Sequence, residues 1–342
     1  MNDFEKLFRS LKIIFSLLMA GVIFISIFIV YYSYNPEMLQ FVQPKSSIWV
    51  VKIPEEQFDA GAMDAIVKKG YQIVTETSSW LGPSTEDPQR RFAGNNLSCS
   101  NCHLQAGAQA GSGSWVGVTD RYPQFRGREN KIGTIEDRIN GCMERSMNGK
   151  ILDVNDPNMM AIVSYMEWLG EGLPEERIKE YSGYPKIVLP NVAVDLGKGK
   201  DVYTRECMVC HGEGGQGIPK PNGVGYTYPP LWGSDSYNNG AGMHRVITAA
   251  EFIKSNMPFL QATWDNPKLT DEEAYNVAGY INSFERPEKA SLTEDFPDKK
   301  LKPVSTPYGP WTDEFPAEQH KFGPFIPIIE FYKKEFGITK SK

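Results

Sequence analysis

Cys99-Ser100-Asn101-Cys102-His103 and Cys207-Met208-Val209-Cys210-His211 are two copies of the pattern CxxCH within one chain. In this pattern the two thiols form thioethers with the vinyl groups of a haem, and the histidine becomes a ligand of the iron. A zinc ribbon would need a second CxxC pair close in space, and a thioredoxin-like site belongs to a βαβ pattern that is missing here. The motifs therefore predict two covalently bound haem c groups, attached through Cys99, Cys102 and His103 and through Cys207, Cys210 and His211.

The segments around the two motifs also repeat. Apolar residues recur at helical intervals over residues 58–78 before the first motif, and residues 195–206 take that place before the second. An apolar helix with a cap and an acidic or Pro start follows each motif, at residues 158–170 and 274–284. This weak internal duplication resembles two class I cytochrome c domains in tandem, an all-α fold with a few helices around each haem.

A membrane anchor is predicted at the N-terminus, where residues 13–32 form an uncharged apolar run of 20 residues. As a helix this run would span roughly 30 Å of hydrocarbon, and it is longer than the apolar core of a secretory signal. Lys6, Arg9 and Lys12 precede it, so the N-terminus is expected in the cytoplasm of a bacterium and the haem domains on the periplasmic face of the inner membrane. The alternative is a cleaved signal.

The predicted organisation has four parts. These are a membrane anchor at residues 1–34, a first haem domain at 35–185, a second haem domain at 186–290 and a C-terminal extension at 291–342. The 342 residues are 41% hydrophobic and carry a net charge of −6, with no basic tract, so binding of nucleic acid is not expected. The extension and His320 within it are assigned to packing or to a partner surface.

The second haem needs a further iron ligand, and Met257 is the predicted one. It lies 46 residues after His211, in the segment FIKSNMP, which resembles the methionine loop of class I cytochromes. Met243 and His244 are the alternative ligands, and any single methionine can also be an ordinary core residue.

The segment at residues 132–149 carries the most chemical information in the chain. Thr134 and Asp137 form a capping pattern, and Asn148-Gly149 is a stop signal, which together predict a helix of about 13 residues. Arg138, Cys142 and Ser146 follow at intervals of four residues and share one face, with Arg145 one turn from the cysteine. Cationic neighbours lower the pKa of a thiol and favour the thiolate that binds iron. A small buried hydrophobe is the alternative reading of Cys142, and Met143, Met147, Met159 and Met160 are alternative ligands.

At these residues the sequence resembles the thiosulfate dehydrogenase family, whose dihaem members couple two thiosulfates into tetrathionate or favour the reverse reaction. The likeness covers roughly residues 60–290 and is carried by the motifs LSCSNCHLQAG, EDRINGCMERSMNG, ECMVCHG, YPPLWG, NGAGM and FIKSNMP. It implies that His103 and Cys142 are the axial ligands of a catalytic haem 1. It also implies that His211 and Met257 ligate haem 2, which exports electrons to an external acceptor such as a small cytochrome c or a terminal oxidase.

The resemblance further implies that Arg128 and Arg138 bind the substrate beside Cys142, with Ser146 nearby. The charge pattern agrees, because residues 119–150 hold seven Lys or Arg against five acidic residues, and two dianions need cationic donors to approach each other. Some members have a lysine before the methionine ligand that competes for the iron; here Asn256 stands there, so no lysine switch is expected. An anchored dihaem electron carrier and a thiosulfate-processing protein of the SoxA type are the rival functions.

Overall fold

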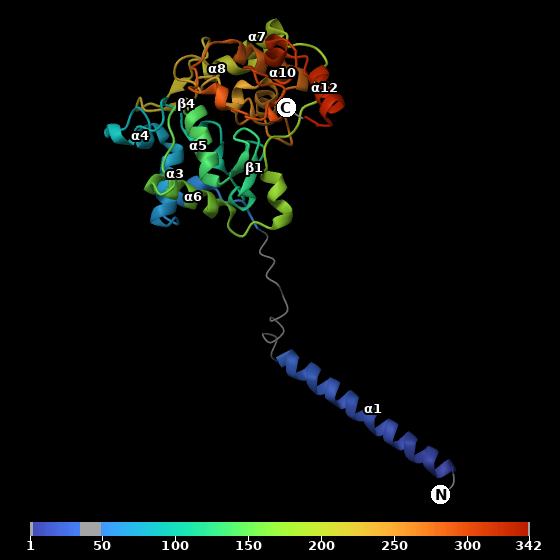
Figure 1. Ribbon diagram of the computed structural model, residues 1–342. Helices are drawn as coiled ribbons and strands as arrows, with labels where there is room; N and C mark the ends of the chain where they lie inside the picture. Colours follow the sequence, from blue (N-terminus) through green and yellow to red (C-terminus); the bar gives the residue numbers. More distant parts are fainter. Residues whose placement is uncertain (1–2, 35–48, 341–342) are drawn as a thin grey trace. The chain divides into compact units, whose positions relative to one another are not determined.

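The computed structural model describes residues 3–34 and 49–340, and the chain divides into two units at residues 1–50 and 51–342. The described part of the first unit contains helix α1 (Asp3–Tyr34) (Figure 1). Among the described residues it is the one helix that is long and apolar enough to cross a membrane, over Phe4–Tyr34. It contains the whole predicted span, and its large apolar side chains are exposed.

The second unit is built from two helical modules that repeat one packing pattern. In the first module α3 (Ala65–Thr75) crosses α6 (Pro157–Gly170), and in the second α7 (Leu196–Val202) crosses α10 (Asp271–Ser283). A glycine allows each close crossing: a Cβ on Gly70 would lie 2.1 Å from the Ala161 carbonyl oxygen, and one on Gly199 would lie 2.3 Å from that of Asn276. The predicted duplication is therefore confirmed in the helix packing.

The helix ends follow local capping chemistry. Thr270 accepts from the backbone of Glu273 at the start of α10, and Asp156 caps α6 at the residue before its first-turn proline. The expected continuous helix over residues 58–78 is wrong: the chain forms α2 (Pro54–Asp59), α3 and α4 (Thr77–Leu81) instead. Gly61, at φ +66°, lies in the break between α2 and α3.

The remaining elements hold the two motifs and the loops around them. Helix α7 runs into a π-helical turn, η7 (Tyr203–Cys207), and then α8 (Met208–His211), so that the second motif lies on helical backbone. The other helices are α5 (Ile135–Arg145), α9 (Val246–Asn256), α11 (Ala317–Phe322) and α12 (Ile326–Phe336). Short 3-10 turns occupy Pro88–Arg90, Cys99–Asn101, Gln105–Gly107, Thr119–Arg121, Glu175–Tyr181, Gly242–His244, Leu292–Glu294 and Lys299–Leu301.

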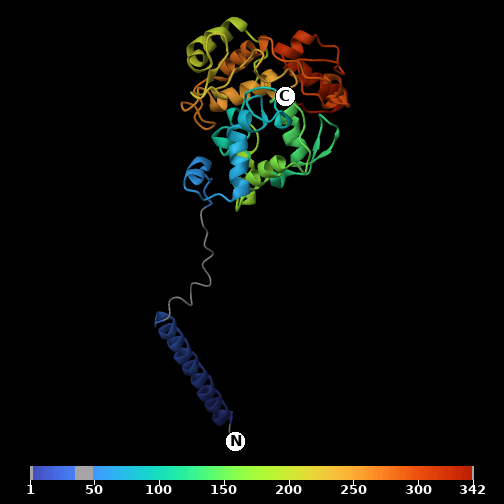
Figure 2. The same ribbon diagram turned by 90° about the vertical axis from the view of Figure 1, so that its left-hand side faces the viewer.

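Two small antiparallel hairpins interrupt the helical architecture. Strand β1 (Gln124–Arg126) pairs with β2 (Lys131–Gly133), with Phe125 opposite Ile132. Strand β3 (Ile218–Pro219) pairs with β4 (Tyr226–Tyr228) across an irregular register. The structure otherwise has the expected mostly helical character, with the second module and the extension packed against the first (Figure 2).

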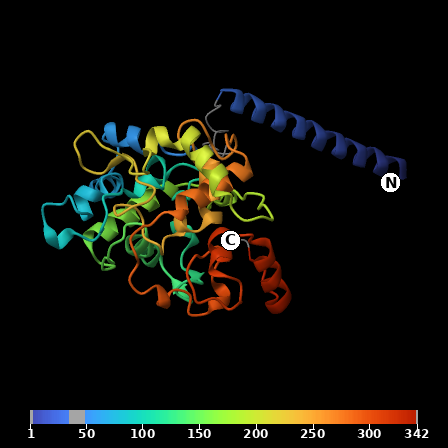
Figure 3. The same cartoon turned by 90° about the horizontal axis from the view of Figure 1, so that it is seen from above.

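The C-terminal extension packs on the second module and forms one side of the unit (Figure 3). Phe325, Ile328 and Tyr332 share a hydrophobic core with Tyr275 and other buried residues of that module. His320 is 1% exposed, and its ring nitrogens contact the Val304 carbonyl and Asp313 at 2.8 Å each. The structure therefore places His320 in packing, as one of the two predicted roles.

Candidate functional site

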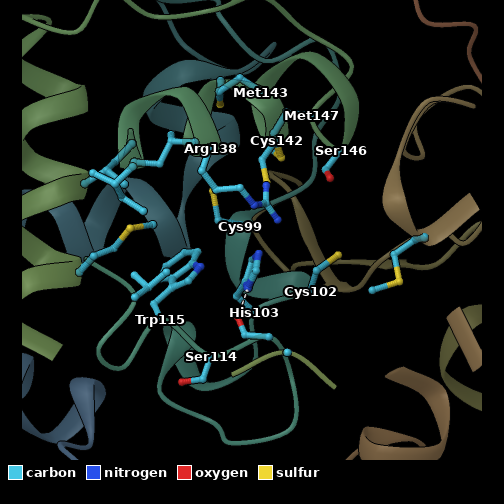
Figure 4. Close-up of a pocket in the computed structure, with 18 of the residues that line it drawn as sticks. Cys99, Cys102, His103, Ser114, Trp115, Arg138, Cys142, Met143, Ser146 and Met147 are labelled. Carbon is cyan, nitrogen blue, oxygen red and sulfur yellow. Dashed lines mark hydrogen bonds between the residues drawn. The ribbon is translucent and has the colours of Figure 1, made fainter. Parts of the chain in front are cut away.

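A cavity of about 310 Å³ brings the first CxxCH motif and helix α5 together (Figure 4). Cys99, Cys102 and His103 line one part of it, and Arg138, Cys142 and Ser146 from α5 line another. His103 points toward Arg138 and Cys142 across the cavity. The capping box of Thr134 and Asp137 starts α5 as predicted, although the helix is 11 residues long rather than about 13. Most of the predicted first-site residues therefore meet in one place.

The His103 ring is oriented by its neighbours. Its Nδ1 lies 2.8 Å from the Gly113 carbonyl oxygen, which can only accept, so Nδ1 carries the proton. The lone pair of Nε2 is then available as a ligand. Trp115 holds the ring from the side, with 4.7 Å between the ring centroids. This is the arrangement that an iron-binding histidine requires.

Cys142 differs chemically from a motif cysteine. Burial raises the pKa of the Cys99 thiol to about 11. Burial acts on Cys142 in the same direction, but Arg138, His103 and Arg145 outweigh it and lower the pKa of this thiol to about 5. Arg138 donates from Nη1 to the Cys142 sulfur over 2.7 Å, and the pKa of Arg138 is raised in turn, mainly by Cys142. The helix face predicted from the i, i+4 spacing thus holds a thiolate beside a guanidinium.

Two of the other arginines have different surroundings. Arg145 does not line the cavity; it is 8% exposed and lies 3.6 Å from the Glu129 carboxylate. Arg128, expected beside Cys142, does not line the cavity either, and its Nη1 donates to Asp295, to Tyr308 and to the Gly240 carbonyl. Sequence reasoning had no signal for this pairing, because Asp295 lies 167 residues away in the C-terminal extension.

A second cavity, of about 450 Å³, surrounds the second motif. Cys207, Cys210, His211 and Met257 all line it. His211 repeats the arrangement of His103, with Nδ1 2.8 Å from the Pro229 carbonyl oxygen, so its Nε2 is also available.

The two alternative ligands for this site have different positions. Met243 lines the second cavity, as Met257 does, so both sulfurs lie in reach of the same space. His244 lines neither cavity; it is buried, and its Nδ1 lies 2.9 Å from the Asn239 carbonyl oxygen. The geometry therefore leaves Met257 and Met243 as the candidates.

The two cavities share a wall. Leu97, Cys102, Tyr237 and Met243 line both of them. Cys102 belongs to the first motif, so the attachment point of one haem borders the space of the other. Because the two cavities share these side chains as a common wall, haem groups bound in them would lie close enough to exchange electrons.

Asn256, immediately before Met257, ties the second site to the first module. It is 0% exposed; its Nδ2 donates to the Gly111 carbonyl, and its Oδ1 accepts from Gln109, both over 2.8 Å. Gly111 belongs to the same loop as Gly113, the partner of His103. Asn256 thus faces the first module and does not line the second cavity.

The residues present fit a haem at each site. Each cavity is bordered by two thiols at CxxC spacing and by a histidine whose Nε2 is free to bind iron, and most of the lining is apolar. Sequence reasoning missed Tyr184, which lines the first cavity, because this residue stands at the predicted boundary between the two haem domains and carries no motif.

Comparison with known proteins agrees with this geometry. Residues 89–174 match the family described as SoxA/TsdA, cytochrome c domain, and residues 196–285 match the family described as cytochrome c. Two cytochrome c domains, each with its own CxxCH motif, mean two covalently bound haem c groups. The predictions of fold and cofactor are therefore confirmed.

Several relatives are similar over most of the chain. The thiosulfate dehydrogenase of Stutzerimonas stutzeri is 37% identical over 245 residues, covering 72% of this chain and 75% of that protein. That of Psychrobacter arcticus is 39% identical, covering 72% and 69%, and that of Allochromatium vinosum is 36% identical, covering 66% and 80%. A solved thiosulfate dehydrogenase (TsdBA) from Marichromatium purpuratum superposes with a TM-score of 0.59 at 35% identity. The match covers 66% of this chain and 47%, less than half, of that one.

Proposed function

This chain belongs to the thiosulfate dehydrogenase family, and we propose that it couples two thiosulfates into tetrathionate at the cavity that contains Cys142. The observation that carries the proposal is the contact between Arg138 and the Cys142 sulfur, 2.7 Å long, on the cavity wall opposite His103. A thiolate held by a guanidinium in a cavity is both a sulfur nucleophile and a site for an anion. A plain electron carrier needs neither.

The proposed chemistry uses the Cys142 sulfur covalently. The thiolate bonds to the outer sulfur of one thiosulfate, which forms a Cys142 S-thiosulfonate and releases two electrons. The outer sulfur of a second thiosulfate then attacks the adduct sulfur that is bonded to Cys142 Sγ. The bond from that sulfur to Cys142 Sγ breaks, tetrathionate leaves, and the Cys142 thiolate is restored. Bound haem supplies the one-electron acceptors that the reaction needs, with His103 and Cys142 proposed as the iron ligands at the first site.

Binding of the anions is assigned to the arginines of the first site. Two dianions that approach each other repel strongly outside water, so cationic donors must offset their charge. Arg138 and Arg121 line the cavity, and Ser146 adds a hydroxyl beside Cys142. Arg128 does not line this cavity; it is proposed as a further substrate ligand on the resemblance of the sequence to the family. Its Nη1 is engaged by Gly240, Asp295 and Tyr308, whereas its Nε and Nη2 donate to no described residue.

Electron export is assigned to the second site. His211 and Met257 are proposed as its iron ligands; a methionine ligand raises the potential of a haem, whereas a thiolate lowers it. Electrons would therefore pass downhill across the shared wall of Leu97, Cys102, Tyr237 and Met243. The final acceptor is an external redox protein, such as a small cytochrome c or a terminal oxidase.

The proposed location is the inner membrane of a bacterium, with the haem domains in the periplasm. Helix α1 has the length and composition of a span, and Lys6, Arg9 and Lys12 lie at its N-terminal end. Covalent attachment of haem c outside the cytoplasm agrees with this orientation.

Thiosulfate-dependent reduction of ferricyanide by the haem-loaded, full-length protein in detergent tests the proposal. We expect turnover by the wild type and its loss in Cys142→Gly, with haem 2 still reducible by dithionite. A wild type with two reducible haems that turns over neither thiosulfate nor, in reverse, tetrathionate would leave the electron carrier as the function.

A further inference from the structure

The C-terminal extension holds Arg128 of the first module through an ion pair and hydrogen bonds. Asp295 Oδ2 lies 2.5 Å from Arg128 Nη1, and the Tyr308 hydroxyl donates to the same carboxylate oxygen over 2.6 Å. The Tyr308 oxygen also lies 3.2 Å from Arg128 Nη1, and the Gly240 carbonyl oxygen lies 3.0 Å from it. The pair is largely shielded from water, since the Arg128 and Asp295 side chains are 12% and 7% exposed. A shielded, charge-assisted pair of this kind fixes a side chain far better than an exposed one does.

The extension also holds the backbone and the side of the same arginine. The Phe296 backbone nitrogen donates to the Arg128 carbonyl over 2.7 Å, and the Arg128 guanidinium lies 4.9 Å from the Phe296 ring centroid. Arg128 is therefore fixed at its main chain, its flank and one terminal nitrogen. Its other N–H groups, on Nε and Nη2, donate to no residue in ranges 3–34 and 49–340.

Neighbouring positive charges explain why the Arg128 side chain needs such contacts to stay in place. Burial, together with Arg128 and other neighbours, lowers the pKa of Arg145 and of Arg245 to about 10 each. These groups repel one another, and without a counter-charge the Arg128 guanidinium would turn away from its neighbours toward solvent. Asp295 supplies that counter-charge, and its own pKa is lowered, with burial opposing and Arg128 leading the groups that lower it.

We propose that Asp295 and Tyr308 are positioning residues of the thiosulfate site, which hold Arg128 so that its Nε and Nη2 edge stays available to the anionic substrate. The inference rests on the proposed function, because it takes Arg128 as a ligand of thiosulfate. It also makes the extension part of the active-site apparatus, although the cytochrome c match ends at residue 285.

The test measures KM and kcat for thiosulfate with the haem-loaded, full-length protein, and measures thiosulfate binding by calorimetry to the fully reduced protein, whose haems cannot accept electrons from it. We expect Asp295→Asn and Tyr308→Phe each to raise KM and Kd together, by about tenfold for Asp295→Asn, which corresponds to the loss of one charge-assisted contact. The value of kcat should stay within about twofold, because the reacting sulfur atoms are not touched.

Asp313→Asn is the matched control. Asp313 is a buried carboxylate of the same extension, which accepts from His320 and Tyr332 over 2.8 and 2.6 Å and does not contact Arg128. This variant should lose stability while KM and Kd stay unchanged. Unchanged or lower KM and Kd in both Asp295→Asn and Tyr308→Phe would overturn the inference, as would an equal rise in Asp313→Asn. A wild type that neither binds nor oxidises thiosulfate would instead refute the proposed function.

Discussion

Replacing Asn256 with alanine tests how the two modules are joined at the second haem site. The change deletes the hydrogen bonds with Gln109 and with the Gly111 carbonyl, each 2.8 Å long. A neutral hydrogen bond contributes about 1 kcal/mol net, and the buried Gly111 carbonyl that loses its partner adds about 1 kcal/mol or more. The third bond, to the Phe252 carbonyl, matters less because that carbonyl also accepts within α9. The free energy of unfolding should therefore fall by about 3 kcal/mol.

Guanidinium unfolding of the full-length haem protein, followed by tryptophan fluorescence, measures this loss. Asn276→Ala is the matched control, since Asn276 is a buried asparagine of the second module whose Oδ1 accepts from the Asp195 backbone over 2.9 Å, away from the junction. Its cost should be about 1–2 kcal/mol. If Met257 ligates haem 2 as proposed, Asn256→Ala alone should also weaken the methionine-to-iron charge-transfer band of the oxidised protein, because Met257 follows directly. Equal losses of unfolding free energy in the two variants, with an unchanged band, would show that Asn256 does not join the modules in this way.

Three further predictions concern His244, the two glycines at the helix crossings, and Arg138. Burial lowers the pKa of His244 from 6.5 to about 3, so between these values the unfolded chain binds one more proton than the folded chain. The free energy of unfolding should therefore fall by about 1.4 kcal/mol for each pH unit below about 6.5. In unfolding experiments over a pH series, His244→Gln should show a weaker dependence of this free energy on pH; the same dependence as in the wild type would contradict the prediction. Gly70→Ala and Gly199→Ala should each lower the free energy of unfolding by about 1–3 kcal/mol, because the added Cβ would lie 2.1 and 2.3 Å, respectively, from a carbonyl oxygen of the facing helix. Unchanged unfolding free energies would show that the two helices can move apart at the crossing without loss. Arg138→Gln should lower kcat/KM for thiosulfate about 100-fold, because it removes the guanidinium beside Cys142, and steady-state kinetics with a loss under about threefold would contradict that role.

The sequence predicted those features whose causes are local. The CxxCH motifs specify covalent haem attachment, and the caps at Thr134 and Thr270 start their helices as expected. The spacing of Arg138 and Cys142 placed both on one helix face, because four residues make about one turn. The break near Gly61 was missed, since the apolar periodicity continues on both sides of it.

Features that depend on distant parts of the chain could not be predicted in this way. The Arg128–Asp295 pair joins residues 167 apart, and nothing near either residue signals the other. The bridge from Asn256 to Gln109 spans 147 residues, and it exists only because the two modules pack together. Substrate and coupling roles of this kind depend on tertiary packing, which periodicity does not encode.

Mass spectrometry of the peptide that contains Cys142, after the oxidised haem protein has been treated with tetrathionate, shows whether this sulfur reacts covalently. We predict an added S2O3 group on Cys142, because attack of its thiolate on tetrathionate releases one thiosulfate and leaves the S-thiosulfonate. The adduct should disappear on addition of excess thiosulfate, and Arg138→Gln should form it more slowly. A protein that turns over thiosulfate while Cys142 stays unmodified under these conditions would contradict covalent chemistry at this sulfur.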